Sequence, residues 1–217
     1  MSDDDQVGEL LGQLDTLSIA DSSGAGGVTL KLTLKNLRDE GTGRLCAALR
    51  GRQEAVVSLD VSCNSIGPAG FESLAELLRS EQGRGVARLD ASANTGGDSG
   101  AATLAAALRS NTTLRSLDIH ACQIHDAGVA ALAEALKVNT GLRHLDLGAN
   151  YIEDAGAVLL AEALKVNVGL TSLNLETNDF TRDGMVALQA AVRSNPRITS
   201  LSQKDRSDIL GEVCVVS

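Results

Sequence analysis

The chain of 217 residues contains very few aromatic side chains and very little proline. Aromatic residues make up 1% of the sequence, tryptophan is absent, and 22 glycines stand against 2 prolines. Because 43% of the residues are nevertheless apolar, the core must be built from aliphatic and small side chains. Regular layers of such side chains are typical of stacked repeats, in which each unit packs only against its neighbours.

Long apolar runs and cysteine pairs are lacking as well. No stretch reaches the roughly 18 consecutive apolar residues that predict a membrane-spanning helix. The opening MSDDDQ differs from the basic start of a secretory signal, so we expect a cytoplasmic protein. The 4 cysteines show neither a CxxC pair nor the spacing of a disulfide framework, and neither a metal nor a disulfide is expected.

Basic side chains are outnumbered by acidic ones. The chain has 19 lysines and arginines against 28 aspartates and glutamates, a net charge of -9 and a sequence pI of about 4.8. Such a charge repels nucleic acid and anionic lipid. The expected partner is therefore a protein with a basic surface.

Motifs of catalysis are also missing from the sequence. It contains neither the GxxxxGK(S/T) phosphate loop nor the HExxH zinc motif, and the glycine-rich NTGGDSG lacks GxGxxG spacing. His120 and His144 lie near Asp118 and Asp146, the residue types of an acid–base pair. No nucleophile motif accompanies them, and an open sheet excludes water poorly. We predict no catalytic residue, no metal, no cofactor and no enzymatic activity.

What the sequence does contain is a unit repeated six times, most clearly as LRHLDLGANYIEDAGAVLLAEALKVNVG at residues 142–169. Its front half alternates like a strand, with Leu145 and Leu147 on one face, and its back half has the helical spacing of Leu160 and Leu164. A glycine marks the same position in each unit: Gly41, Gly70, Gly100, Gly128, Gly156 and Gly184. Each unit therefore predicts one strand and one helix, and a partial seventh strand ends the series.

A column of asparagines lies six residues before these glycines. Its members are Asn64, Asn94, Asn150 and Asn178, and Cys122 takes the place once. Each amide is expected to bond the backbone of its own turn and of the next one, which satisfies polar groups that stacking would otherwise bury unpaired. The thiol can supply only the donor half of that role. The predicted helix starts are marked as N-caps by Asp98, Asp126 and Asp154.

The pattern LxxLxLxxN/C, followed by a full helix at a period of 28 residues, resembles the ribonuclease-inhibitor-like class of leucine-rich repeats over about residues 28–202. The resemblance implies an α/β solenoid, a short horseshoe with a parallel concave sheet and helices on the convex side. Spacing predicts the same curvature, because strands pair about 4.8 Å apart and helices need roughly 8–10 Å. In the third unit Gly96 replaces the expected apolar residue, and SEQGRGV adds two residues before Val86. We expect a looser stack there.

The chain is expected to divide into three segments. Residues 1–27 predict an N-terminal cap helix and a flexible joint, residues 28–202 the repeats, and residues 203–217 a C-terminal tether. The tether ends in Cys214, Val215, Val216 and Ser217, a CaaX pattern whose serine favours farnesyl. We expect a prenyltransferase to attach a covalent farnesyl group to Cys214. One lipid gives only reversible binding, so association with the cytosolic face of membranes would be peripheral.

The residue between the two strand leucines of each unit is expected to face the concave side. Four adjacent units carry aspartate at this position: Asp60, Asp90, Asp118 and Asp146. Like charges on neighbouring strands repel, which costs stability unless something offsets it. The four aspartates are predicted to form an unpaired acidic row that binds a basic partner. Arg88, His120 and His144 flank this row and are predicted to contact the partner as well. The alternative is that aspartate is simply common at this position in such repeats.

These features predict a monomeric, non-enzymatic protein-interaction scaffold or adaptor that is farnesylated and reversibly membrane-associated. One alternative is a regulator of a small GTPase, since Ran GTPase-activating proteins use similar repeats. Another is a structural subunit of a cytoskeletal or axonemal assembly. The alternatives would place the chain at the cytoskeleton, the cilium or the nuclear periphery.

Overall fold

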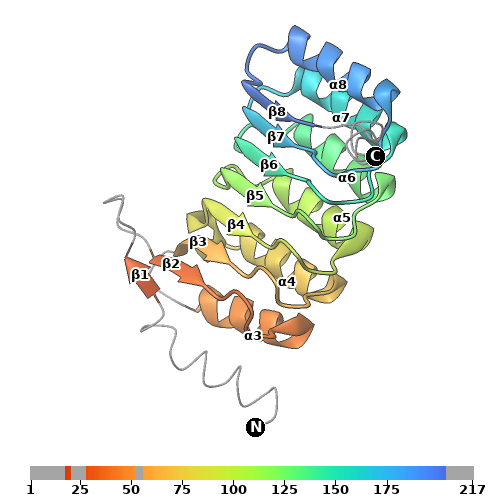
Figure 1. Ribbon diagram of the computed structural model, residues 1–217. Helices are drawn as coiled ribbons and strands as arrows, with labels where there is room; N and C mark the ends of the chain where they lie inside the picture. The colour runs from red at the N-terminus through yellow and green to blue at the C-terminus, as the bar shows by residue number, and fades with distance from the viewer. Residues whose placement is uncertain (1–17, 21–27, 52–55, 204–217) are drawn as a thin grey trace, which may run out of the picture.

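The computed structural model describes residues 18–20, 28–51 and 56–203, in which strands and helices alternate along the chain (Figure 1). The strands are β1 Ser18–Ala20, β2 Val28–Lys31, β3 Val56–Asp60, β4 Arg88–Asp90, β5 Ser116–Asp118, β6 His144–Asp146, β7 Ser172–Asn174 and β8 Ser200–Ser202. The helices are α3 Arg38–Arg50, α4 Pro68–Arg79, the 3-10 helix η1 Gln82–Gly85, α5 Gly97–Leu108, α6 Asp126–Leu136, α7 Asp154–Val166 and α8 Arg182–Ser194.

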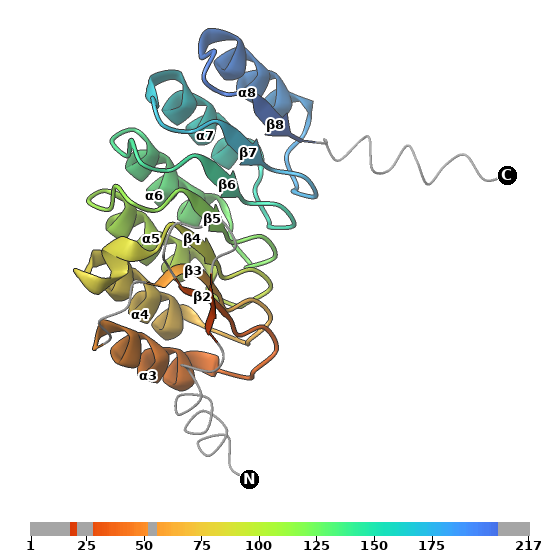
Figure 2. The ribbon, with the colours of Figure 1, turned by 90° about the vertical axis from the view of Figure 1, so that its left-hand side faces the viewer.

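All the described strands form one open sheet of 8 strands in chain order. From β2 to β8 the neighbours are parallel, and β1 pairs with β2 in the antiparallel direction. The strands line one side of the molecule and the helices the other, as two views at right angles show (Figure 1, Figure 2). The predicted α/β solenoid is confirmed.

The N-terminal end differs from the prediction at β1. Ser18–Ala20 form a strand where the sequence predicted the end of the cap helix, and Ser18 pairs with Leu30 of β2. The remainder of that predicted helix lies outside the described residues, as do residues 204–217 of the tether, Cys214 among them. An antiparallel strand thus covers an edge of β2 that would otherwise present unpaired backbone groups.

The core consists of aliphatic layers that run through the stack. Leucines of neighbouring strands are direct Cα partners, as Leu89, Leu117 and Leu145 illustrate, and each of these three is at most 2% exposed. Helical leucines such as Leu132 and Leu160 close the same layers from the convex side, both at 0%. No helix in the described ranges is long and apolar enough to cross a membrane.

The asparagine column bonds each of its units to the preceding one, and not to the next one as predicted. Nδ2 of Asn150 donates to carbonyl groups of its own turn and to the carbonyl of Ile119 in the preceding unit, at 3.1 Å. Its Oδ1 accepts the N–H groups of Cys122 and Ile124, both at 3.0 Å. In the same column the Sγ of Cys122 donates to the carbonyl of Ala91 at 3.2 Å, which is the donor half of the amide's role.

A second asparagine column, which was not predicted, lies at the turns between helix and strand. Its members are Asn111, Asn139, Asn167 and Asn195. Nδ2 of Asn139 donates to the carbonyls of Leu108 and Asn111 at 2.6 and 2.8 Å, and its Oδ1 accepts the N–H of Leu142 at 2.8 Å. The signal was the same spacing of 28 residues. From the third unit onward, two polar columns therefore fix a unit against the one before it.

The aspartates predicted to cap their own helices cap the next helix instead. Oδ1 of Asp154 accepts the N–H groups of Thr181 and Gly184, at 2.8 and 3.0 Å, at the start of α8. Asp98 and Asp126 reach the starts of α6 and α7 in the same way. Burial raises the pKa of Asp154, but the hydrogen bonds from Thr181 and Gly184 outweigh it, and the pKa is lowered overall.

The glycines of the repeat make room for contacts between units. A Cβ on Gly156 would lie 2.3 Å from Oδ1 of the capping Asp126. In the third unit the predicted loose packing is wrong, because the ring of Phe71 fills the space beside Gly96 and Gly100. A Cβ on Gly96 would lie 2.7 Å from Cε2 of Phe71, which is 0% exposed. The two added residues are absorbed by η1.

Candidate functional site

The concave face carries four carboxylates at the ends of neighbouring strands. Asp60, Asp90, Asp118 and Asp146 close β3, β4, β5 and β6, are direct Cα partners from strand to strand, and are all half-buried. We call these four residues the acidic row. Asn174 continues it on β7.

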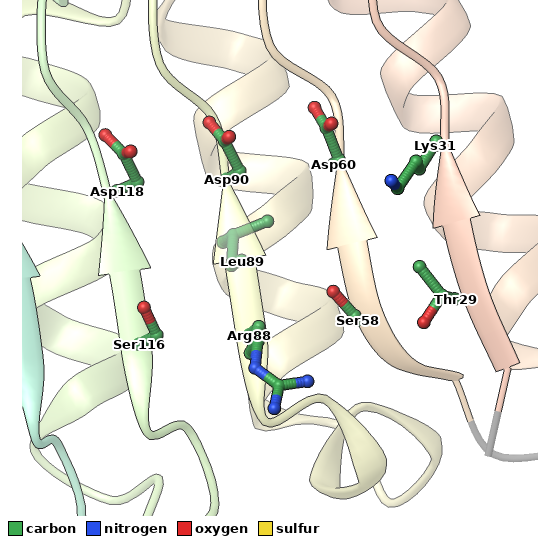
Figure 3. Close-up of a pocket in the computed structure, with 9 residues that line it drawn as sticks. All are labelled: Thr29, Lys31, Ser58, Asp60, Arg88, Leu89, Asp90, Ser116 and Asp118. Atoms are coloured by element: carbon green, nitrogen blue, oxygen red, sulfur yellow. The ribbon is translucent and has the colours of Figure 1, made fainter. Parts of the chain in front are cut away.

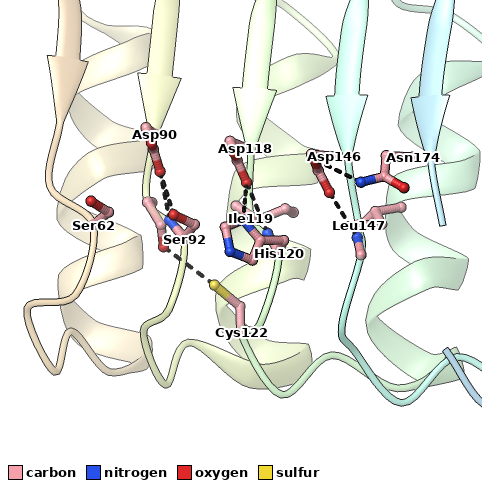
Figure 4. A network of polar contacts seen from close by, with 12 residues as sticks. Ser62, Asp90, Ser92, Asp118, Ile119, His120, Cys122, Asp146, Leu147 and Asn174 are labelled. Atoms are coloured by element: carbon pink, nitrogen blue, oxygen red, sulfur yellow. Dashed lines mark hydrogen bonds and ion pairs between the residues drawn. The ribbon is translucent and has the colours of Figure 1, made fainter. Parts of the chain in front are cut away.

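The acidic row is hydrogen-bonded, which corrects the prediction that it is unpaired. Oδ1 of each aspartate accepts the backbone N–H two residues further along, at 3.0, 3.0, 3.1 and 2.8 Å. Ser92 Oγ also donates to Asp90 Oδ1 at 2.6 Å, and His120 Nδ1 lies 2.9 Å from Asp118 Oδ1 (Figure 4). One oxygen of each carboxylate therefore shapes the turn that follows its own strand.

The second oxygens distinguish the ends of the row from its centre. Thr33 Oγ1 donates to Oδ2 of Asp60 at 3.1 Å, and Asn174 Nδ2 donates to Oδ2 of Asp146 at 2.9 Å. Within the described ranges no hydrogen bond reaches Oδ2 of Asp90 or of Asp118. The charge offered to a partner is therefore concentrated on the two central strands.

The environment of Asp118 disfavours its charged form. Burial raises the pKa of this carboxyl, and the charges of Asp146 and Asp90 raise it further, while the hydrogen bonds from His120 lower it only in part. The folded chain therefore holds this proton more strongly than the unfolded chain. Stability contributed in this way is present at low pH and is lost as the pH rises through the folded pKa. At neutral pH the charge of Asp118 thus costs stability.

Replacing Asp118 by asparagine is expected to stabilise the fold at about pH 7 by up to about 1 kcal/mol, the scale of a like-charge pair on neighbouring strands. Asparagine keeps the oxygen that accepts the N–H of His120 and removes the charge. Thermal unfolding should show a gain that shrinks as the pH falls to about 4. Glu72→Gln, on the exposed side of α4, serves as the control with the same change of charge. A pH-independent gain, or a loss, would contradict the assignment.

The other residues predicted to contact a partner lie around the acidic row. Arg88 starts β4 and His144 starts β6, both exposed, and His120 follows β5 beside Asp118. Arg88 also lines a pocket of about 260 Å³ in the N-terminal half of the concave face, together with three members of the row (Figure 3). The structure thus gathers these side chains on one face, and the pocket there is open and polar.

One trio of described residues has the chemistry of a metal site. Ligand atoms of Asp118, His120 and Asp146 lie within 4.8 Å of one another. Asp118 and His120 already contact each other, and Oδ1 of Asp146 accepts the N–H of Gly148. Because part of the donor set is used in this way, we assign no metal to it.

The buried cysteines lack the reactivity of nucleophiles. Burial raises the pKa of Cys46 and of Cys122 to about 12, so almost none of either thiol is ionised at neutral pH. Cys63 is exposed in the turn after β3. The third histidine, His125, stacks on Tyr151 with ring centroids 5.0 Å apart, away from the acidic row.

The repeated unit matches a known sequence profile. The leucine-rich repeat profile fits residues 56–75, 110–133, 138–161 and 166–188, and each match includes a strand and the first part of the helix after it. The chain contains leucine-rich repeats. A search of curated proteins found no match. The ribonuclease-inhibitor-like class stays a prediction from the period.

Three solved structures are similar to the chain. The tropomodulin C-terminal domain of Caenorhabditis elegans is 12% identical with a TM-score of 0.50, over 88% of this chain and 93% of that domain. Actin-binding site 2 of leiomodin-1 is 20% identical with a TM-score of 0.45, over 52% and 67% of the two chains. An internalin of Listeria monocytogenes is 21% identical with a TM-score of 0.42, over 69% and 42%. At 12% identity the likeness to the tropomodulin domain reaches the fold alone.

Proposed function

We propose that this leucine-rich-repeat chain is a non-enzymatic scaffold that binds a protein partner through its acidic row. The observation that carries the proposal is the charge of the central strands, since Asp118 stands where burial and two neighbouring carboxylates disfavour ionisation. An ionisable group whose surroundings disfavour its charged form marks a candidate functional surface. A partner with a basic surface would offset the repulsion within the row.

The columns of hydrogen bonds support this proposal because they hold the face rigid. The side chains of the row stand on strands in exact register, and each is fixed by the turn that it bonds. A preorganised surface loses little conformational freedom on binding, which improves affinity. The open face also suits an extended contact better than a small substrate, which needs an enclosed site.

Replacing all four aspartates of the acidic row by asparagine should reduce partner recovery by about tenfold or more, the scale of losing charged contacts in an interface. Asparagine preserves the Oδ1 atoms that accept the backbone N–H groups, so the variant is expected to fold. The measurement is quantitative mass spectrometry of proteins captured by the full chain from cells that express it.

The matched control removes four carboxylates from the helical side. Its substitutions are Glu72→Gln, Glu76→Gln, Glu134→Gln and Glu162→Gln, at exposed positions of α4, α6 and α7. Partners of the concave face should bind this variant as they bind the wild type. Equal losses in both variants, or no loss in the aspartate variant, would remove the acidic row as the binding surface.

A farnesyl group on Cys214 is a separate part of the proposal. It is supported by the sequence pattern CVVS alone. Intact-mass analysis of the chain expressed in a eukaryotic cell should show the added farnesyl, and Cys214→Ser should abolish both the mass shift and the fraction that sediments with membranes. An unmodified chain that ends in Ser217 would refute this part and leave the scaffold proposal intact.

Two other functions remain predictions of the repeat type. Regulation of a small GTPase would appear as faster single-turnover GTP hydrolysis when the chain is added. A structural role in a cytoskeletal assembly would appear as sedimentation of most of the chain with filaments after detergent extraction. If the acidic row binds a partner that is neither a small GTPase nor a cytoskeletal filament, we expect neither faster GTP hydrolysis nor sedimentation with filaments.

A further inference from the structure

The pocket of about 260 Å³ on the concave face has two rows of different chemistry (Figure 3). The row at the strand starts consists of Thr29, Ser58, Arg88 and Ser116, which are Cα partners from strand to strand. The row at the strand ends consists of Lys31, Asp60, Asp90 and Asp118, again in register. The pocket therefore pairs an arginine flanked by hydroxyls with a group of carboxylates.

Both kinds of charge in this pocket are accessible. Arg88 and Lys31 are exposed, and Asp90 and Asp118 have an Oδ2 atom that no other described residue bonds. A partner with only basic side chains would bring a cation against Arg88. A partner with only acidic side chains would bring an anion against Asp90. Charge complementarity thus favours a segment that carries one charge of each sign.

The distance between the two rows fits an extended peptide. Arg88 and Asp90 are two residues apart on the same face of β4, which corresponds to roughly 6.6 Å along a strand. Side chains two residues apart in an extended peptide share one face with the same separation. Guanidinium binds a carboxylate or a phosphate with two parallel hydrogen bonds, and the hydroxyls of Ser58 and Ser116 lie on either side to add donors.

We propose that the pocket binds an extended partner segment in which an anionic side chain, carboxylate or phosphate, lies two residues from a lysine or arginine. The anionic group contacts Arg88, and the cationic group lies among Asp60, Asp90 and Asp118. The inference rests on the proposed binding function of the concave face. It changes the expected partner from a uniformly basic surface to a dipolar one.

Displayed peptide libraries with one fixed central pattern and random flanks test this specificity on the full chain. The patterns are Glu-Xaa-Lys, Lys-Xaa-Glu, Lys-Xaa-Lys and Glu-Xaa-Glu, and the dissociation constants of the enriched peptides are measured by fluorescence polarisation. A dipolar pattern should exceed Lys-Xaa-Lys by about tenfold, the scale of one charge-assisted contact. Synthetic peptides with phosphoserine in place of glutamate then determine which anion binds more tightly.

Two substitutions at one position make the test decisive. Arg88→Ser installs the residue that the neighbouring strands carry at this position, so folding should be unaffected, and dipolar peptides should lose about tenfold in affinity. Arg88→Glu should transfer the preference to Lys-Xaa-Lys. Arg79→Ser, at the exposed end of α4, is the control and should change nothing.

The outcomes separate this inference from the proposed function. If Lys-Xaa-Lys peptides bind best and Arg88→Ser has no effect, the dipolar specificity is wrong and a basic partner remains. If no enriched peptide loses affinity when Asp90 and Asp118 become asparagine, the concave face is not the binding surface, and both proposals fail.

Discussion

Replacing Asn150 by alanine is expected to destabilise the chain by about 3–5 kcal/mol. The amide makes five hydrogen bonds to backbone groups. Two of the carbonyls have a second donor, because Leu147 also accepts from Asn178 and Gly148 from the N–H of Ala121. Alanine therefore deprives three buried groups of the bond that this amide makes, at about 1–3 kcal/mol each. Urea unfolding of the full chain measures the loss.

The chain supplies its own control for this substitution. Cys122 occupies the same column and donates to a carbonyl of the preceding unit, so Asn150→Cys should retain the bond to Ile119. Of the four bonds that it loses, only the two to the N–H groups of Cys122 and Ile124 leave a group without a partner. Its loss should be about 1 kcal/mol smaller than that of Asn150→Ala. A loss below about 1 kcal/mol in both variants would show that the column does not hold the units together. Equal losses above that value would show that a thiol does not replace the amide as a donor.

The polar columns explain what the sequence could predict and what it could not. Position within the 28-residue period identified Asn150 and its equivalents, because a polar residue at a buried position of a strand turn needs backbone partners. The same reasoning applied to Asn139 would have found the second column. The prediction covered only the asparagines that lie six residues before the repeated glycines, and Asn139 lies in the turn after the helix.

The unit to which a side chain bonds was harder to predict than the residue type at each position. Asp126 was predicted to cap its own helix, yet it caps α7, because a stack places the side chain of one unit beside the helix start of the next. The hydrogen bonds of the acidic row, which the sequence did not predict, have a similar origin. They depend on turns after the strands that curl the N–H groups of Ser92 and His120 back toward Oδ1. Strand alternation places an aspartate on a face, and only the turn decides what it bonds.

The dipolar pocket shows the same limit for the functional surface. Strand alternation predicted that Arg88 and the acidic row share one face, and the face as a whole was predicted to be acidic. The register of the sheet separates them instead, with Arg88 between two serines at the strand starts and the carboxylates at the strand ends. Opposite charges that lie two residues apart on a strand can each contact a different side chain of a bound peptide, although they cancel in the net charge.

Replacing Phe71 by alanine is expected to cost about 3–5 kcal/mol, as for other buried aromatic side chains. The side chain is 0% exposed, and its ring atoms lie 2.7–2.9 Å from the positions that Cβ atoms on Gly96 and Gly100 would take. Replacing Gly96 by isoleucine alone should also destabilise the chain, by about 1–3 kcal/mol, because the new side chain meets the ring. Both losses are measured as free energies of unfolding in urea.

The double variant Phe71→Ala with Gly96→Ile should recover much of the stability of the wild type. The equivalent positions one unit later hold Ala101 and Ile124, both 0% exposed, so a small residue on the helix with isoleucine in the turn is a combination that the stack already accommodates. The coupling between the two substitutions should be about 1–3 kcal/mol in favour of the pair. Additive losses would mean that Phe71 does not fill the space left by Gly96. A recovered double variant would show that volume is shared between adjacent units, which is why a departure from the repeat pattern in one unit need not loosen the stack.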